Sequence, residues 1–311
     1  MKPWQFGPVT FRFQLSDWVF FTASLPMQVR AESLLDASTA VKSPQPPTEK
    51  LLSGSEGFSI RNLPVEGEQP TLSTVEGYLS YIPLQYLHCY IDLAWTFDQY
   101  VSKFSSKTRS TIQRKIRKFK EHCGGDIHWK SYLLPEELSD FFHQARLVSK
   151  LTYQERLLDV GLPESEEFKQ NAMSLAKNDR LRAYILFDGN RPVSYLYCPE
   201  QDGILVYAYL GYDPEYQHLS VGTVLQWLAI EQIFQEGKFR YFDFTEGQSS
   251  HKQLFGSHQR LCANVFFVRK TLRNILLIRA HHLTNLFSKW LGNTLEKHGV
   301  KAKIKKMLRR A

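Results

Sequence analysis

The chain has 311 residues, of which 43% are hydrophobic and 14% aromatic, and its formal net charge is +8 at pH 7. This length predicts one large domain or two ordinary ones, with ample apolar side chains for a core. No segment approaches the roughly 20 consecutive apolar residues of a transmembrane helix, so a cytoplasmic protein is expected. The stretch DWVFFTASLPM is too short to span a membrane, and the acid in front of it is unlike a signal peptide.

The positive charge favours an anionic partner, without choosing among nucleotide, nucleic acid and lipid surface. The cysteines are scattered, and no two have the spacing of metal ligands or of a redox pair: Cys89, Cys123, Cys198 and Cys262. Free thiols are therefore expected. The pair His281-His282 has no companion ligands nearby in sequence, so no metal site is expected.

The first 95 residues predict a small strand-containing region. Residues 9–15 and 18–25 have the composition of strands, and residues 79–93 form a further extended stretch. Between them, residues 34–68 are rich in Ser, Pro, Gly and Glu, which predicts a flexible linker.

From residue 96 onward the pattern becomes regular. Thr96 can cap a helix that continues to Gly124-Gly125, where two glycines end it. A strand and two helices are expected next, over residues 126–133, 135–150 and 164–177. Three strands then follow as a meander, over residues 181–189, 191–200 and 203–213, because the loops between them have hairpin turn chemistry.

The next elements are a helix over residues 220–236, a strand over 239–247, a helical turn over 249–255 and a last strand over 261–270. A meander followed by a helical crossover predicts a mixed α/β sheet.

The start of the 220–236 helix is a candidate anion site. The first N–H groups of a helix have no partner within the helix, and together with the helix dipole they favour a phosphate. The alternative is an ordinary strand-to-helix turn, with Ser220 as N-cap and Gly222 as a packing glycine.

Three stretches carry a family resemblance: SSKTRSTIQRKIRKF at 105–119, LVYAYLGYDPEYQHLSVGTVLQWLAIE at 205–231 and FDFTEGQSSHKQLFGS at 242–257. With the order of elements, they resemble the GNAT acyltransferase fold. The closer resemblance is to the group related to the FemAB peptidyltransferases and to the CelD/BioF2-like acetyltransferases of polysaccharide clusters. It covers about residues 96–270 and implies a mixed, mostly antiparallel sheet with flanking helices. Residues 271–311 then remain as a basic amphipathic helical tail.

The resemblance implies that acetyl-CoA is the acyl donor. The thioester would lie along Leu210, Gly211 and Tyr212. The residues implied to hold phosphate are Gln217, Ser220, Val221, Gly222 and Thr223. Lys252 is a further candidate, because a lysine near this turn could neutralise phosphate charge. The family pattern Gln/Arg-x-x-Gly-x-Gly/Ala has Ser220 at its first glycine here. This departure leaves aminoacyl-tRNA, the donor of the FemAB relatives, as the alternative.

Titratable residues gather at the end of the 239–247 strand. An attacking amine must lose a proton and the departing thiolate must gain one, so Asp243 or Glu246 is expected as base and His251 as acid. The alternative is structural, with Asp243 capping a turn and His251 and Lys252 solvated at a short helix. In the related group an aromatic residue precedes the lysine, where this chain has His251.

Tyr153, Gln154 and Arg156 follow the 135–150 helix, where the resemblance places the acceptor side. The alternative is the amphipathic end of that helix. The expected function is transfer of an acyl group to an amine on a sugar, lipid-linked sugar or peptide precursor in exopolysaccharide or cell-envelope biosynthesis. A FemAB-type peptidyltransferase and a non-catalytic binding protein on a decayed acyltransferase fold are the alternatives.

Two basic segments remain open to more than one interpretation. The acid-free basic run over residues 103–120 is expected to be a solvated helix face, with RNA binding as the rival that would suit a tRNA donor. Apart from that case, no nucleic-acid partner is expected. The tail over 271–311 is expected either to pack on its own domain or to lie on an anionic membrane.

Overall fold

The computed structural model describes residues 3–15, 18–36, 39–152, 161–247 and 249–297. These fall into two compact units, the first from residues 1–88 with 260–311 and the second from residues 89–259. Each unit has apolar clusters of its own. Within the described ranges, no helix combines the length and the apolar character needed to cross a bilayer.

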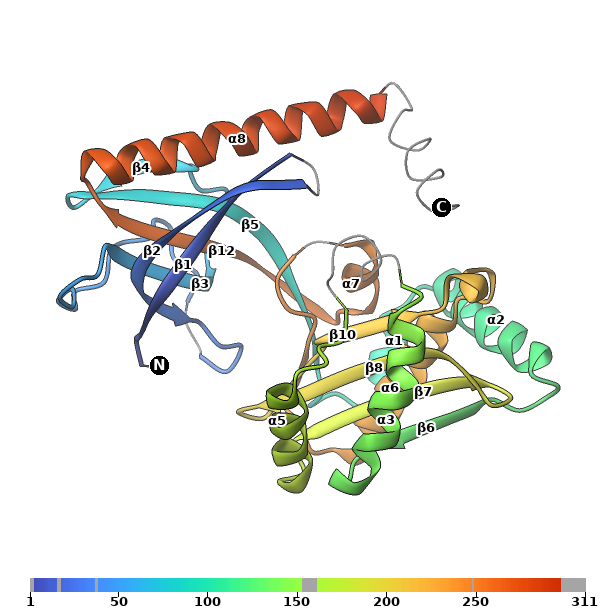
Figure 1. Ribbon diagram of the computed structural model, residues 1–311. Helices are drawn as coiled ribbons and strands as arrows, with labels where there is room; N and C mark the ends of the chain where they lie inside the picture. The colour runs from blue at the N-terminus through green and yellow to red at the C-terminus, as the bar shows by residue number, and fades with distance from the viewer. Residues whose placement is uncertain (1–2, 16–17, 37–38, 153–160, 248, 298–311) are drawn as a thin grey trace. The chain divides into compact units, whose positions relative to one another are not determined.

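The first unit is a sheet covered by one long helix (Figure 1). Its strand order is β1-β2-β3-β12-β5, with β4 on the other edge of β5. The strands are β1 Gln5–Leu15, β2 Trp18–Ala31, β3 Gly57–Pro64, β4 Leu72–Val75, β5 Tyr78–Asp92 and β12 His258–Arg269. The helix α8 spans Leu272–Lys297. The predicted strands at 9–15, 18–25 and 79–93 are thus confirmed as parts of β1, β2 and β5.

Strand β3 lies inside the segment for which the sequence predicts a flexible linker. Residues 57–64 of that segment pair with both β2 and β12. Phe58 and Ile60 are buried against Val265 and Phe267 of β12. The linker prediction is therefore wrong for these residues, because a short apolar strand is hidden among the Ser, Pro and Gly residues around it.

The second unit contains a mixed and mostly antiparallel sheet, as expected. Its order is β11-β9-β8-β7-β6, with β10 also on β8 and the end of β5 on β11. Only the β9–β11 pair is parallel among the described strand pairs of this unit. The strands are β6 His128–Tyr132, β7 Leu181–Asp188, β8 Arg191–Gln201, β9 Ile204–Val206, β10 Tyr209–Tyr212 and β11 Tyr241–Asp243.

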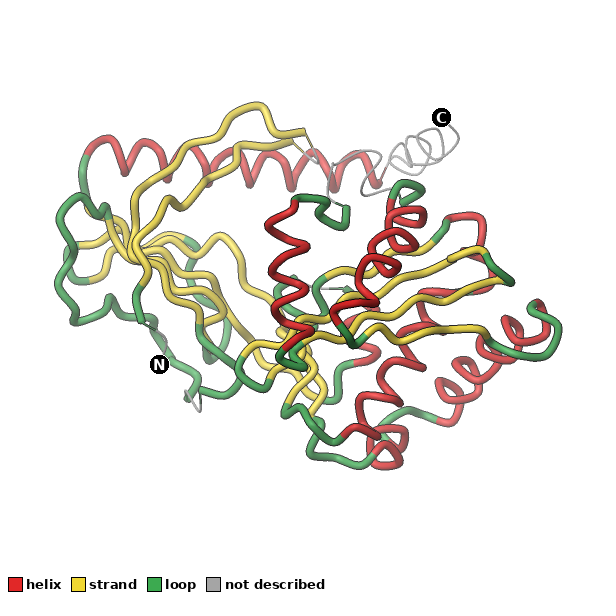
Figure 2. Tube along the Cα trace, turned by 60° about the horizontal axis from the view of Figure 1, so that its bottom comes forward, coloured by secondary structure: helices red, strands yellow, loops and turns green. Residues whose placement is uncertain are grey.

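Helices cover both faces of this sheet (Figure 2). Successive side chains of a strand point to opposite faces, and β7 is buried on both. Ala183 and Ile185 pack with α3 Leu138–Ser149 and α5 Glu166–Lys177. Tyr184 and Leu186 pack on the other face with α1 Phe97–Ser102, α2 Ser106–His122 and α6 Val221–Glu236. The short elements are η1 Pro135–Glu137, η2 Pro214–Leu219 and α7 Ser250–Phe255.

The helix predicted from Thr96 to the two glycines is in fact two helices. Thr96 caps α1 as expected, but α1 ends at Ser102. Ser105 then starts α2, because its backbone is extended and its side chain accepts a hydrogen bond from the Thr108 N–H. Gly124 and Gly125 follow α2 with positive φ, so the predicted end is confirmed.

Candidate active site

A β-bulge opens the sheet between β9 and β10. Glu200 pairs with Leu205 and Tyr197 pairs with Tyr209, so three steps along β8 correspond to four steps along its partner. The extra residue is Ala208, whose N–H donates to the backbone oxygen of Tyr197 over 3.2 Å. Such an insertion bends a strand and changes the direction of the residues after it. The strand predicted as one over residues 203–213 is therefore two.

Strand β9 stays paired with β11, and β10 does not. The last hydrogen bond between the β9 segment and β11 runs from the Tyr207 N–H to the backbone oxygen of Asp243 over 2.8 Å. Beyond it, β10 pairs with β8, its strand partner in the described part of the chain. The sheet thus splays between β10 and the residues that come after β11.

Two backbone N–H groups of β10 face this opening. In an antiparallel pair, successive residues alternately bond to the partner and point away from it. The Asp213 N–H donates to the Val193 oxygen over 2.9 Å, and Gly211 lies opposite Tyr195 in the same register. The alternation therefore directs the N–H groups of Leu210 and Tyr212 away from β8.

Gly211 is required for packing in this strand. A Cβ atom at this position would overlap the ring of Tyr195. Its oxygen accepts a hydrogen bond from the Ser194 hydroxyl over 2.9 Å. The predicted position of Gly211 on the thioester strand therefore has a structural cause as well.

The turn after β10 ends in a left-handed residue. The Asp213 side chain caps η2 by accepting from the Glu215 N–H over 3.0 Å. Ser220 then has φ 56° and ψ 39°, and α6 begins directly after it. A non-glycine residue seldom adopts this conformation, because its Cβ crowds the backbone.

Ser220 does not cap α6 with its side chain, contrary to the ordinary-turn alternative. The backbone oxygen of Ser220 accepts hydrogen bonds from the N–H groups of Thr223 and Val224, over 2.9 and 3.1 Å. The N–H groups of Val221 and Gly222 have no acceptor among the described residues. The helix start therefore offers two donors and the positive end of its dipole to an external anion.

Gly222 brings this helix start against β10. A Cβ atom at Gly222 would lie 3.4 Å from both Leu210 Cδ2 and Tyr212 Cδ1. The splayed strand and the helix start are thus in contact through one residue without a side chain. Gln217 is exposed on η2, and its backbone oxygen accepts a hydrogen bond from the Ser220 N–H over 3.1 Å.

The basic helix α2 contributes a cation to the same turn. Lys118 Nζ donates to the His218 oxygen over 3.1 Å. Lys115, one turn earlier on α2, is among the charges that lower the pKa of His251. The basic run is therefore a solvated face in part, while Lys118 contacts the predicted site and Lys115 is close enough to affect the pKa of His251.

The predicted catalytic carboxylates lie at and after the end of β11. Asp243 ends that strand, and its side chain accepts from the Thr245 N–H over 2.7 Å. It therefore does cap a local turn, as the structural alternative predicts. The Glu246 backbone oxygen accepts from Lys252 Nζ over 2.7 Å. Burial lowers the pKa of Lys252, although Asp243, Cys89 and Glu246 oppose that shift.

His251 is partly buried and paired with Gln226 of α6. Burial lowers its pKa to about 4, and Lys115 and Lys252 add to the shift. The ring is therefore neutral at pH 7. With its Nε2–H donated to Gln226 Oε1, the free Nδ1 can accept a proton but has none to give. This state does not favour the expected role of His251 as an acid.

The structure brings most of the predicted residues together around the splay and the α6 start. Tyr153, Gln154 and Arg156 lie outside the described residues. The sequence-based prediction missed Tyr207 and Gln226. Tyr207 makes the last backbone hydrogen bond before the sheet splays. Gln226 is fully buried, and its Nε2 has no hydrogen-bond partner in the described chain. Neither residue has a local signal, because each role arises from tertiary pairing.

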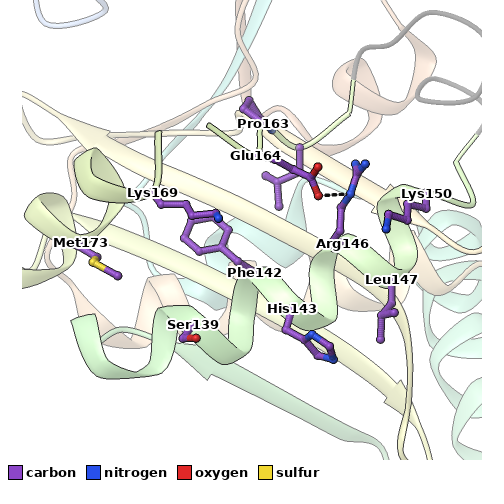
Figure 3. Close-up of a pocket in the computed structure, with 11 residues that line it drawn as sticks. Ser139, Phe142, His143, Arg146, Leu147, Lys150, Pro163, Glu164, Lys169 and Met173 are labelled. Atoms are coloured by element: carbon purple, nitrogen blue, oxygen red, sulfur yellow. Dashed lines mark ion pairs between the residues drawn. The ribbon is translucent and has the colours of Figure 1, made fainter. Parts of the chain in front are cut away.

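A separate cavity of about 360 Å³ lies between α3 and α5 (Figure 3). Its wall combines apolar side chains such as Phe142 and Met173 with the cations Lys150 and Lys169. Arg146 and Glu164 form an ion pair across it. None of the residues predicted for the donor or for catalysis lines this cavity, so the chemistry is not assigned to it.

Comparison with protein families decides the class of the second unit. Residues 106–253 match the family described as an acetyltransferase (GNAT) domain. This segment, just under half of the chain, is similar to GNAT acetyltransferase domains. The match runs from α2 through the splayed strand and the α6 start to His251 and Lys252. The expectations of a GNAT-like fold and of an N-acyltransferase enzyme are thereby confirmed.

Comparison with curated protein sequences gave no significant match. Among solved structures, FemX is 11% identical, with 87% of this chain and 90% of that chain covered and a TM-score of 0.48. L-PGS from Bacillus licheniformis is 12% identical, over 74% and 73%, with a TM-score of 0.45. A GCN5-related N-acetyltransferase from Kribbella flavida is 11% identical, over 70% and 71%, with a TM-score of 0.35. Similarities of this size carry no argument about substrate.

Proposed function

We propose that the protein transfers an acyl group, acetyl in the simplest case, from acyl-CoA to a primary amine. The observation that carries this proposal is the contact of the splayed strand with the open start of α6 at Gly222. The N–H groups of Leu210 and Tyr212 suit a thioester oxygen, and those of Val221 and Gly222 suit a pyrophosphate. Lys118 supplies positive charge at the same turn.

The donor supplies an activated carbonyl when bound, and the chain supplies the polar groups around it. As the amine attacks, negative charge develops on the carbonyl oxygen, and fixed β10 N–H groups would stabilise it. Asp243 and Glu246 are the proposed acceptors of the amine proton. They lie at and just after the Tyr207–Asp243 hydrogen bond at which the opening begins. As the new C–N bond forms, the C–S bond of the thioester breaks, and CoA leaves as a thiolate that takes a proton from water.

A nucleotide phosphate fits the turn in charge and geometry. The backbone donors there do not depend on the hydroxyl of Ser220, because that side chain makes no cap hydrogen bond. A main-chain site of this kind tolerates serine at the first glycine position, at the cost of a strained φ.

We propose a chemical class for the acceptor and no single compound. An amine on a sugar, lipid-linked sugar or peptide precursor would suit a member of the CelD/BioF2-like group in polysaccharide or envelope synthesis. We place the acyltransferase chemistry in the second unit, residues 89–259, and not in the whole range 96–270 expected from the sequence, because β12 pairs with β3 of the first unit. We place its site in the cytoplasm. For a lipid-linked acceptor, the segment over residues 271–311 would contact the membrane surface.

The α2 cations support a second candidate donor, aminoacyl-tRNA. Further exposed basic side chains of α2 accompany Lys115 and Lys118, among them Arg114 and Arg117. A tRNA donor would need such a surface and would show strong salt dependence. A non-catalytic binding protein would keep the anion site without turnover.

Thermal unfolding with and without acyl-CoA tests the proposal. A ligand at 100 times its Kd should raise the free energy of unfolding by about 2.7 kcal/mol. Stabilisation by acetyl-CoA but not by uncharged CoA fragments lacking the pyrophosphate would support the donor site. Stabilisation by charged tRNA alone would favour the second candidate.

A further inference from the structure

Helix α8 buries one face in its unit, and its opposite face is apolar and uncovered within the described part of the chain. Asn274, Ile278 and His281 succeed one another at intervals of four and three residues and are buried. Ile278 joins the core cluster of β1 and β2, and His281 Nε2 is 3.2 Å from the Arg12 oxygen. This face holds the helix on the sheet.

The opposite face presents large apolar side chains to solvent. Leu272, Leu276, Leu283 and Trp290 are spaced by four, seven and seven residues, which places them on one side of a helix. The exposed members are Leu272 82%, Leu276 69%, Leu283 63%, Leu286 51%, Phe287 51% and Trp290 59%. We call these six residues the outer stripe. From Leu272 to Trp290 it is about 27 Å long.

Charge around the outer stripe favours an anionic partner. Arg273, Arg279 and Lys289 are exposed along the helix. The chain after Lys297 adds six Lys and Arg residues and no acid. A second copy of this helix would bring like charges together. An anionic lipid surface would instead attract these side chains while it takes up the apolar ones.

A second exposed apolar group lies at the tip of the β1–β2 hairpin in the same unit. Trp18, Val19, Phe20 and Phe21 are all at least 40% exposed. A strand that packs on one face exposes every second side chain, so four consecutive exposed residues indicate a tip that extends beyond the packing. A helical partner on α8 would leave these rings in water, whereas a bilayer is wide enough to contact a second apolar group.

We propose that the outer stripe of α8 docks on the surface of an anionic phospholipid bilayer, with the helix parallel to the membrane. Trp290 and Phe287, whose rings stack 5.6 Å apart, would lie at the headgroup level. This inference names the surface and the lipid class for the membrane contact included in the proposed function. It does not depend on the donor site.

Vesicle flotation of the full chain tests the docking surface. The protein should float with vesicles of phosphatidylcholine containing one-third phosphatidylglycerol and much less with pure phosphatidylcholine, and salt should weaken the binding. The triple variant Leu283→Ser, Phe287→Ser, Trp290→Ser should bind at least about tenfold more weakly. Each cation contributes about fivefold, so Arg279→Glu with Lys289→Glu should also bind weakly.

Matched controls separate binding through the outer stripe from nonspecific hydrophobic binding to the vesicles. Leu134 and Leu147 of the second unit are 53% and 47% exposed, and their change to Ser should leave flotation unchanged. Gly222→Val, expected to lose the donor, should float like the wild type, so the two proposals fail separately. Circular dichroism should show that every variant is folded.

Three results would overturn the docking surface. The first is a wild type that does not float with anionic vesicles at low salt. The second is a folded triple variant that floats as well as the wild type. The third is light scattering that shows a wild-type dimer turned monomeric by the triple variant, without vesicle binding, which would assign the outer stripe to a second copy.

Discussion

Lys118 of α2 donates a hydrogen bond to the backbone oxygen of His218, 100 residues further along the chain. The bond fixes a cation at the turn that leads into α6. Lys118→Ala should therefore weaken acetyl-CoA binding by roughly tenfold, because charge-assisted contacts to phosphate are among the stronger ones. Lys120→Ala, an exposed change on the same helix, is the control and should leave the affinity unchanged. Equal affinities in calorimetry for both variants would remove Lys118 from the donor site.

Ser220 holds a left-handed conformation that glycine adopts without strain. Ser220→Gly should raise the free energy of unfolding by roughly 1 kcal/mol. It should leave donor binding unchanged, because the proposed donors are backbone groups. Denaturant unfolding and calorimetry would measure the two effects. A loss of donor affinity in this variant would show that the hydroxyl, and not the main chain, recognises the phosphate.

His251 should make the protein less stable in acid. Its pKa in the folded chain is about 4, below the ordinary value of 6.5. Between these two values the unfolded chain binds more protons, so the free energy of unfolding falls as the pH drops from 6.5 towards 4. His251→Asn should show a shallower fall over this window. Parallel slopes for the two proteins would mean that His251 is not held neutral.

Asp243 and Glu246 can be separated by isosteric changes. Asp243→Asn keeps an oxygen for the Thr245 N–H but cannot take a proton. If Asp243 is the base, kcat should fall by about 10²–10⁴-fold, with little change in KM for acyl-CoA. Glu246→Gln is the matching test. Release of free thiol in the presence of an amine acceptor would measure both. Near wild-type kcat in both folded variants would leave the proton to water or another group.

The order of helices and strands in the second unit was accessible from the sequence because its signals are local. Thr96 and Gly124 mark helix ends by their own conformational preferences, and the 220–236 helix begins within one residue of its predicted start. The break before α2 also had a local signal in Ser105. Strand β3 was hidden, because Phe58 and Ile60 are its only buried large apolar side chains and lie in a polar segment, where they form no visible period.

The splay and the pairs at the site could not be predicted in the same way. The bulge at Ala208 is a mismatch of register between two strands, and neither strand shows it alone. His251 and Gln226 lie 25 residues apart and meet only through packing. Burial at this meeting point, with Lys115 and Lys252 nearby, lowers the pKa of His251. Chemistry that depends on burial therefore had to come from the structure.

Isothermal titration of acetyl-CoA into the wild type, Gly222→Ala and Gly222→Val measures whether the contact at Gly222 forms the donor site. The space at Gly222 admits one methyl group beside Leu210 and Tyr212, and a branched side chain would push the helix start away from β10. We expect measurable wild-type binding, a change of only a few-fold in Gly222→Ala, and a loss of at least about a hundredfold in folded Gly222→Val. Equal affinity in the wild type and Gly222→Val would contradict this expectation.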